Sequence, residues 1–179
     1  MSGKILVTCA SRYGSTEEIA ERIAATFAAE GTETDVRAAY EVERLEGYRA
    51  VVLGSPIYHG KLLGGAIGFA RRLKDELAGM PTALFVVCLT MSMPSREGVR
   101  KLITRIQPML ELIHPKDLGL FAGKVDYANA GWFMRMVLKL TKIPEGDFRK
   151  WDVIERWSKE VLPLLLGESK PDETTGEPC

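Results

Sequence analysis

The sequence has few cysteines, and their arrangement suits neither a disulfide framework nor a metal site. Three occur in 179 residues, Cys9, Cys88 and Cys179. They form no CxxC pair and no Cys/His spacing suitable for zinc. We therefore expect no metal ligands. Cys9 and Cys88 fall in apolar segments, where a free cysteine behaves as a small buried hydrophobic residue.

Neither sign of charge is in excess. Twenty-four Lys and Arg residues balance twenty-four Asp and Glu residues, so no global field favours nucleic acid as a partner. The balance also differs from the strongly acidic surface expected of a carrier that docks onto basic redox partners. We expect no nucleic-acid partner. The oligomeric state stays open, a homodimer included.

Long apolar runs are missing as well. No stretch approaches the ~20 apolar residues that a membrane-spanning helix requires, and the start MSGKILV has no secretory-signal pattern. A content of 46% hydrophobic and 27% charged residues is typical of a globular protein. We expect a cytoplasmic chain with one domain over residues 1–166 and a disordered polar tail over residues 167–179.

Strand and helix patterns alternate along the chain, which predicts an α/β fold with a mainly parallel sheet. The first strand contains Ile5, Leu6 and Val7 and ends at Cys9. The other expected strands cover residues 33–38, 48–54, 82–89 and 117–125. The expected helices are one that buries Ile19, Ala20, Ile23, Ala24 and Phe27, and three over 65–77, 99–113 and 151–166. Residues 127–147 fall outside the alternation and are interpreted as an insertion near the fifth strand.

The most informative segment runs from the first strand into the first helix. Ser11, Gly14, Ser15 and Thr16 lie between them, at a helix start that carries unpaired N–H groups and a partial positive charge. Hydroxyls and a glycine at such a place make a pocket for a phosphate. The alternative is an ordinary N-cap at Ser15 or Thr16, with Glu17 or Glu18 in the first turn.

Two further loops follow the third and fourth strands. In a doubly wound sheet, ligands bind beyond the carboxyl ends of the strands, at the switch point of strand order. The three loops at such ends are 11–16, 55–65 and 90–94. There is no G-x-x-x-x-G-K-[ST] sequence, which argues against a P-loop nucleotidase.

Ser11-Arg12-Tyr13-Gly14-Ser15-Thr16 resembles the phosphate loop of flavodoxins, and GSPIYHGKL resembles their second flavin loop. The chain is most similar to the menaquinone-dependent protoporphyrinogen IX dehydrogenase branch, through FAGKVDYANAGWFMRMVLKL and GDFRKWDVIERW. The resemblance implies a flavodoxin-like, five-stranded parallel sheet of order 2-1-3-4-5 with helices on both faces. It also implies FMN as cofactor. The implied FMN-binding residues are Ser11, Arg12, Tyr13, Gly14, Ser15, Thr16, Ser55, Pro56, Ile57, Tyr58, His59, Gly60, Thr90, Met91, Ser92 and Met93.

The flavin ring would lie between the second and third loops, where backbone groups tune its electronics. Tyr58 is the aromatic available for stacking, or else a surface loop residue. His59 is a candidate proton donor near the flavin, or a solvated loop residue. Arg12 pairs with phosphate or a substrate carboxylate, or is solvated. The third loop offers Met91 and Met93 but no Tyr or Trp, which favours a flavin that admits a substrate.

Residues 131–142 are expected to form a helix with a basic face and an aromatic, apolar remainder. One interpretation is a helix clamped onto its own domain. The other is a lip that contacts a membrane surface, a quinone or a flat apolar substrate, unless Trp132 or Tyr127 covers the flavin.

Three functions remain. The first is an FMN-dependent oxidoreductase, similar to protoporphyrinogen dehydrogenase, that passes electrons from a reduced substrate to a quinone or other acceptor. The second is a single-electron carrier between redox proteins. The third, a receiver-type module without cofactor, needs acidic residues where Cys9-Ala10-Ser11 stand.

Overall fold

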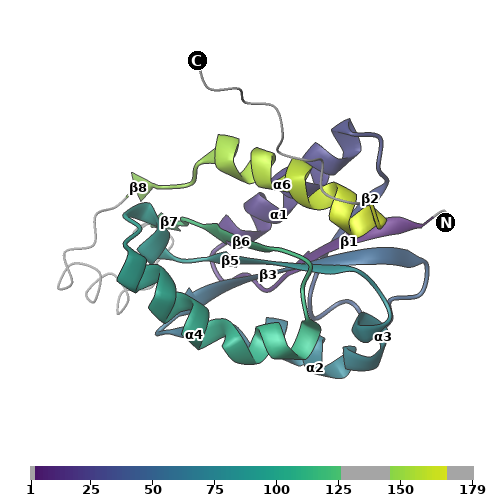
Figure 1. Ribbon diagram of the computed structural model, residues 1–179, viewed down its shortest axis with the longest axis horizontal. Helices are drawn as coiled ribbons and strands as arrows, with labels where there is room; N and C mark the ends of the chain where they lie inside the picture. Colours follow the sequence, from purple (N-terminus) through teal and green to yellow (C-terminus); the bar gives the residue numbers. More distant parts are fainter. Residues whose placement is uncertain (1–2, 126–145, 169–179) are drawn as a thin grey trace, which may run out of the picture.

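The computed structural model describes residues 3–125 and 146–168 (Figure 1). Its centre is a sheet in which five strands pair in parallel, in the order β2-β1-β3-β5-β6. Counted along the chain without the short β4, this is the expected order 2-1-3-4-5. The parallel strands are β1 (Lys4–Cys9), β2 (Thr34–Ala38), β3 (Tyr48–Tyr58), β5 (Thr82–Val87) and β6 (Leu118–Phe121).

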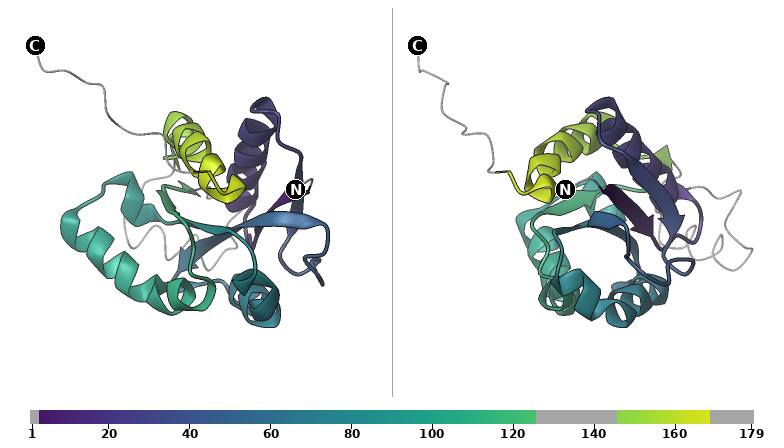
Figure 2. Two further views of the ribbon diagram at one scale, coloured as in Figure 1. Left: turned by 45° about the vertical axis from the view of Figure 1, so that its right-hand side comes forward. Right: turned by 90° about the vertical axis from the view of Figure 1, so that its right-hand side faces the viewer.

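Helices cover both faces of this sheet, as the sequence predicts. The helices α1 (Ser15–Ala29) and α6 (Trp151–Leu166) lie side by side on one face. The other face carries α2 (Gly64–Arg72), α3 (Lys74–Ala78) and α4 (Arg96–Ile113), and Figures 1 and 2 show these two layers on opposite sides of the strands. Central strands covered on both sides bury nearly every residue, which is why β1 and β5 read as apolar runs.

The core is accordingly divided by the sheet into two clusters. Phe27, Phe85 and Trp157 belong to the cluster under α1 and α6, whereas Phe69 and Ile106 belong to the cluster over α2 and α4. The five apolar positions predicted for the first helix are all buried, as are both Cys9 and Cys88. The helical spacing in the sequence therefore identified the buried face of α1 correctly.

Three expected elements are divided in the structure. The helix predicted over 65–77 breaks at Leu73, which ends α2 and precedes α3, and both Leu73 and Leu77 are buried. The strand predicted over 82–89 ends at Val87 because the chain turns into the 3-10 helix η1 (Leu89–Ser92). The strand predicted over 117–125 leaves the sheet after Phe121, and β7 (Lys124–Val125) then pairs antiparallel with β8 (Gly146–Asp147).

The second predicted loop is largely a β-hairpin. The strand β3 continues to Tyr58 and pairs antiparallel with β4 (Lys61–Leu62). His59 and Gly60 connect them with φ of 48° and 76°, and two positive φ values in succession are the mark of a type I′ turn. The segment from Ser55 to Tyr58 is therefore strand, held in place by the ladder.

The helices α4 and α6 each contain an internal proline, Pro108 and Pro163. Both helices continue past their proline, to Ile113 and Leu166. Among the described helices, none combines the length and the apolar character needed to cross a bilayer.

Candidate functional site

The loops expected to carry the chemistry follow the carboxyl ends of β1, β3 and β5, which are neighbours in the sheet. The β1–α1 loop and the β3–β4 hairpin come together through two aromatic rings. The ring centroids of Tyr13 and Tyr58 lie 5.9 Å apart, edge to face. Segments that are more than forty residues apart in the sequence thus meet beyond one edge of the sheet, where open α/β sheets bind their ligands.

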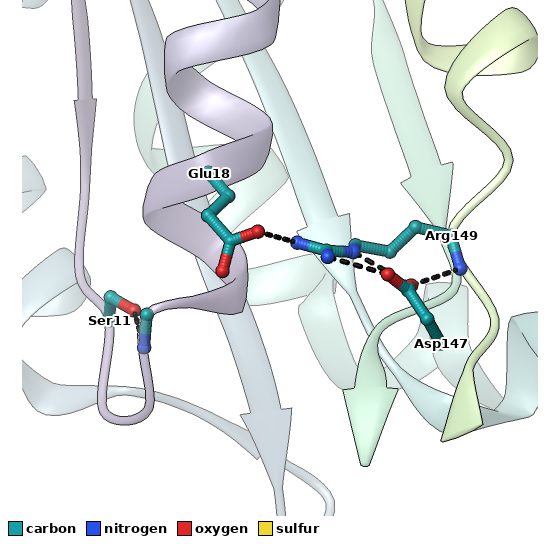
Figure 3. Close-up of polar contacts among 5 residues, drawn as sticks. Ser11, Glu18, Asp147 and Arg149 are labelled. Atoms are coloured by element: carbon teal, nitrogen blue, oxygen red, sulfur yellow. Dashed lines mark hydrogen bonds and ion pairs between the residues drawn. The ribbon is translucent and has the colours of Figure 1, made fainter. Parts of the chain in front are cut away.

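The first of these loops ends in a helix start with no side-chain cap. Gly14 is the N-cap of α1 and has φ of 84°, in the left-handed region. The Ser11 hydroxyl accepts a hydrogen bond from the Gly14 amide at 3.1 Å, which closes the loop below the helix (Figure 3). The alternative of an ordinary cap at Ser15 or Thr16 is therefore wrong, because the chain enters the helix through a glycine that offers no acceptor.

This helix start suits an anion. Gly14 has no side chain that could accept from the N–H groups of the first turn of α1, and apart from its two chain neighbours no atom of the described residues lies within 4 Å of the position that a Cβ on Gly14 would occupy. The N–H groups of a first helical turn, left without a side-chain partner and open on that side, form the donor set that a phosphate binds. Ser11 is exposed and Ser15 is half-buried, whereas Thr16 is buried. The residues present thus fit a phosphate group.

The aromatic and basic residues of the first two loops are stacked. The guanidinium carbon of Arg12 lies 5.5 Å from the centroid of the Tyr13 ring. Tyr58, which contacts the Tyr13 ring edge to face, has its pKa raised, chiefly by burial and then by the neighbouring Tyr13. Tyr58 is therefore half-buried against the first loop, and its stacking on the flavin stays a prediction.

The start of the second predicted loop is buried. Ser55 lies within β3, and its hydroxyl accepts a hydrogen bond from the Leu63 amide at 3.1 Å and donates one to the Pro56 carbonyl at 3.0 Å. Pro56 is buried beside it and Ile57 is half-buried. The hydroxyl of Ser55 thus fixes the return of the hairpin into α2.

The tip of the hairpin is exposed. His59 occupies the first turn position with its side chain exposed, and Gly60 the second. A Cβ placed on Gly60 would lie 3.3 Å from the guanidinium carbon of Arg105, so a cationic side chain of α4 lies against the turn. Arg105 was not identified from the sequence, because nothing in its own neighbourhood relates it to residue 60.

The third loop is the 3-10 turn η1. Thr90 is exposed and Met91 half-buried, and the Ser92 hydroxyl donates to the Leu89 carbonyl at 2.7 Å. Met93 is 86% exposed. This loop adds thioether and methyl groups to the site but no aromatic ring.

A pocket of about 490 Å³ adjoins the first loop on the side of β2. It is lined by residues from the ends of β1 and β2 and from the start of α2, among them Ser11, Arg37 and Gly65. Tyr40 also lines it and is 78% exposed. The sequence analysis did not select Arg37 or Tyr40, since they belong to no motif and reach the site only through strand pairing.

One ion-pair network ties the first turn of α1 to β8, as Figure 3 shows. The Arg149 guanidinium donates to Glu18 Oε2 at 2.6 Å and to Asp147 Oδ2 at 2.6 Å. Its side chain is only 5% exposed. Hydrogen bonds with Asp147 raise the pKa of Arg149 and lower that of Asp147, so both groups stay charged. Within the described residues, no group of three His, Cys, Asp or Glu side chains could hold a metal ion.

Several expected features lie outside the described residues. These are Tyr127, Trp132 and the remainder of the insertion at 127–145, including the proposed lip at 131–142, and the tail from residue 169. Only the end of the insertion, Gly146–Asp147, is described, and it forms β8.

Comparison with known proteins places these observations in context. The family model of the flavodoxin domain matches residues 6–150. The chain is 26% identical to the protoporphyrinogen IX dehydrogenase [quinone] of Escherichia coli (strain K12), covering 90% of this chain and 96% of that protein. It is 25% identical to the protein of the same name from Leishmania major, covering 99% of this chain and 83% of that protein.

Solved structures agree on the fold. Oxidised Flavodoxin 2 from Bacillus cereus is 26% identical and superposes with a TM-score of 0.51 over 68% of this chain and 85% of that chain. A Streptococcus pneumonia TIGR4 flavodoxin superposes with a TM-score of 0.55 at 14% identity, over 89% of this chain and 97% of that one.

Proposed function

Because the chain belongs to the flavodoxin-domain family, whose cofactor is FMN, we propose that it is an FMN-dependent oxidoreductase of the protoporphyrinogen dehydrogenase type. It takes reducing equivalents from a flat, partly reduced substrate and passes them to a quinone. The single observation that carries this proposal is the similarity to two protoporphyrinogen IX dehydrogenases [quinone] along almost the whole chain.

FMN supplies the redox chemistry, and the residues of the chain bind and orient it. The open first turn of α1 and the exposed Ser11 hydroxyl are the donors for the phosphate. Tyr58 on the hairpin and the backbone of η1 are the candidates for the ring, with His59 as a further candidate at the hairpin tip. These assignments rest on the motif and on the meeting of the loops through Tyr13 and Tyr58.

Composition of the site supports a substrate-accessible flavin. Of the described residues in the three loops, only Tyr13 and Tyr58 are aromatic, both on the first two loops, and η1 is followed by the exposed Met93. A thioether is a soft, adaptable contact for a flat apolar ligand. The balanced charge of the chain also agrees less with a carrier that docks by long-range electrostatics.

The second candidate is a flavodoxin-type carrier of single electrons. It is favoured by the likeness to oxidised Flavodoxin 2 from Bacillus cereus, which has the same 26% identity to this chain as the Escherichia coli dehydrogenase. A carrier would exchange electrons with a protein partner and would need no small-molecule substrate.

An anaerobic assay separates the two. The purified protein is expected to be yellow, or to become so with added FMN, and to convert protoporphyrinogen to fluorescent porphyrin only when a menaquinone analogue is present. For each pair of hydrogen equivalents removed from the porphyrinogen, one quinone becomes a quinol. Electron exchange with reduced ferredoxin without porphyrinogen oxidation would favour the carrier instead. A colourless protein that takes up no FMN would refute both.

A further inference from the structure

Arg149 sits between two carboxylates at the base of the phosphate loop. Its Nη1 contacts Glu18 Oε2 at 2.6 Å, and its Nε and Nη2 contact the two Asp147 oxygens at 2.8 Å and 2.6 Å. Glu18 lies on the turn of α1 that directly follows the loop, because its amide donates to the Gly14 carbonyl at 3.0 Å. Figure 3 shows the Glu18 side chain reaching from this turn toward Arg149, with the Ser11 loop at the foot of the same helix.

The arginine is fixed in place by its surroundings. Its guanidinium carbon lies 4.5 Å from the centroid of the Trp151 ring, and its backbone amide donates to Asp147 Oδ1 at 3.1 Å. The preceding residue anchors the segment, since the Phe148 amide donates to the Gly123 carbonyl at 3.2 Å. A planar guanidinium held by two carboxylates and stacked on an aromatic ring has little freedom to move away.

The position of Glu18 is unfavourable for the proposed cofactor. A phosphate at the start of α1 would carry negative charge within about one helical turn of the Glu18 carboxylate. Two negative charges at this separation repel each other, the more so where solvent is partly excluded. With Arg149 in place, the cluster of Glu18, Asp147 and Arg149 carries one net negative charge. Without the arginine it would carry two.

We propose that Arg149 is a positioning residue for FMN, which favours the phosphorylated cofactor by offsetting the charge of Glu18 beside the phosphate loop. It does so without contacting the phosphate. The inference rests on the proposed function only in that FMN binds at this loop, and it does not depend on which substrate the flavin oxidises.

Riboflavin provides the decisive comparison, because it shares the ring and ribityl chain of FMN but lacks the phosphate. We expect Arg149→Met to weaken FMN binding about threefold to tenfold in low salt and to leave riboflavin binding unchanged. Glu18→Gln is expected to strengthen FMN binding by a similar factor. The double variant should return close to the wild-type affinity. Titration of the apoprotein with each flavin, followed by flavin fluorescence, measures all of these constants.

Two matched variants separate charge from shape. Arg149→Lys keeps the charge but loses the two-pronged contact with Asp147, so it should keep most of the FMN preference. Arg22→Met also breaks an ion pair between α1 and α6, with Glu155 at 2.7 Å, and also removes a cation from the Trp151 ring. Arg22 lies one helical turn farther from the loop than Glu18 does. Arg22→Met should therefore change the ratio of FMN affinity to riboflavin affinity less than Arg149→Met does.

The inference is overturned if Arg149→Met weakens both flavins equally, or if Glu18→Gln leaves FMN affinity unchanged. If Arg149→Met fails to fold, the FMN affinity of Glu18→Gln alone tests the inference. A wild-type protein that binds FMN but oxidises no porphyrinogen would refute the proposed activity and leave this inference standing. A wild-type protein that binds neither flavin would refute both.

Discussion

Tyr13 and Tyr58 contact each other edge to face, with ring centroids 5.9 Å apart and planes at 81°. Tyr13 belongs to the loop after β1 and Tyr58 ends β3, so one ring pair joins the two loops that the sequence assigns to the cofactor. Tyr13 is 37% exposed, which leaves one side of the pair open to a ligand. The contact therefore helps to hold the two loops in the arrangement that forms the candidate site.

A double-mutant cycle on Tyr13→Ala and Tyr58→Ala should give a coupling of about 0.5–1.5 kcal/mol in the free energy of unfolding, the usual value for such an aromatic pair. Urea unfolding of the four apoproteins measures it. Tyr58→Phe keeps the ring contact and should show the wild-type coupling and near wild-type FMN affinity. A coupling near zero would mean that the two loops are held together by their backbones alone.

Much of the fold could be predicted because it depends on local periodicity. The apolar run at Ile5–Val7 and the helical spacing from Ile19 to Phe27 identify a doubly covered strand and the core face of α1, and the structure buries them accordingly. The hairpin was missed because its turn uses His59 at a positive φ, whereas the sequence signal for a type I′ turn is Asn-Gly or Asp-Gly.

The site could be predicted in part for the same reason. The loop from Ser11 to Thr16 is contiguous, so its pattern can be recognised in the sequence. The alternative of an ordinary cap at Ser15 or Thr16 is wrong, because Gly14 is the N-cap. The pairing of Glu18 with Arg149 joins residues 131 apart. Neither residue stands in a motif that points to the other, so only the packing of α6 and β8 against α1 brings them together.

Gly14→Ala should weaken FMN binding by about tenfold or more, because a Cβ at this N-cap would project where the phosphate must approach the backbone. The substitution also costs about 1–2 kcal/mol of stability, since Gly14 has φ of 84°. Gly31→Ala is the matched control, with φ of 79° and an equally open Cβ position beyond the other end of α1. Flavin titration and urea unfolding of both variants make the comparison. Equal FMN affinities in the two would argue against the loop assignment.

Thr8→Val should raise the free energy of unfolding by about 1 kcal/mol. Thr8 is fully buried in β1, and its hydroxyl has no hydrogen-bond partner among the described residues. Replacing an unpaired buried hydroxyl by a methyl group of the same shape removes a desolvation cost. Thr82→Val is the control, because the Thr82 hydroxyl donates to the Met80 carbonyl at 3.3 Å. This variant should gain less stability than Thr8→Val does, or lose stability. Urea unfolding decides, and a loss of stability in Thr8→Val would show that the hydroxyl has a partner in solution.

Cys9→Ala should make the protein less sensitive to alkaline pH. Cys9 is 5% exposed, and burial, followed by the charges of Glu17 and Glu21, raises the pKa of its thiol from 9.0 to about 12. Above pH 9 the unfolded chain releases this proton and the folded chain keeps it, so the contribution of Cys9 to stability falls as pH rises, by about 1.4 kcal/mol per pH unit until the folded thiol itself ionises.

The difference in unfolding free energy between wild type and Cys9→Ala should therefore shift by about 1 kcal/mol between about pH 9 and about pH 10, where the unfolded thiol passes from half to almost fully ionised. Cys88→Ala is the matched control, because burial raises the pKa of that thiol as well but backbone and side-chain hydrogen bonds at Met91 and Thr90 oppose the rise. The corresponding pH-dependent shift in unfolding free energy for Cys88→Ala should be smaller than that for Cys9→Ala. Parallel pH profiles for wild type and Cys9→Ala would mean that the Cys9 thiol titrates normally in the folded protein, and that the end of β1 is open to solvent.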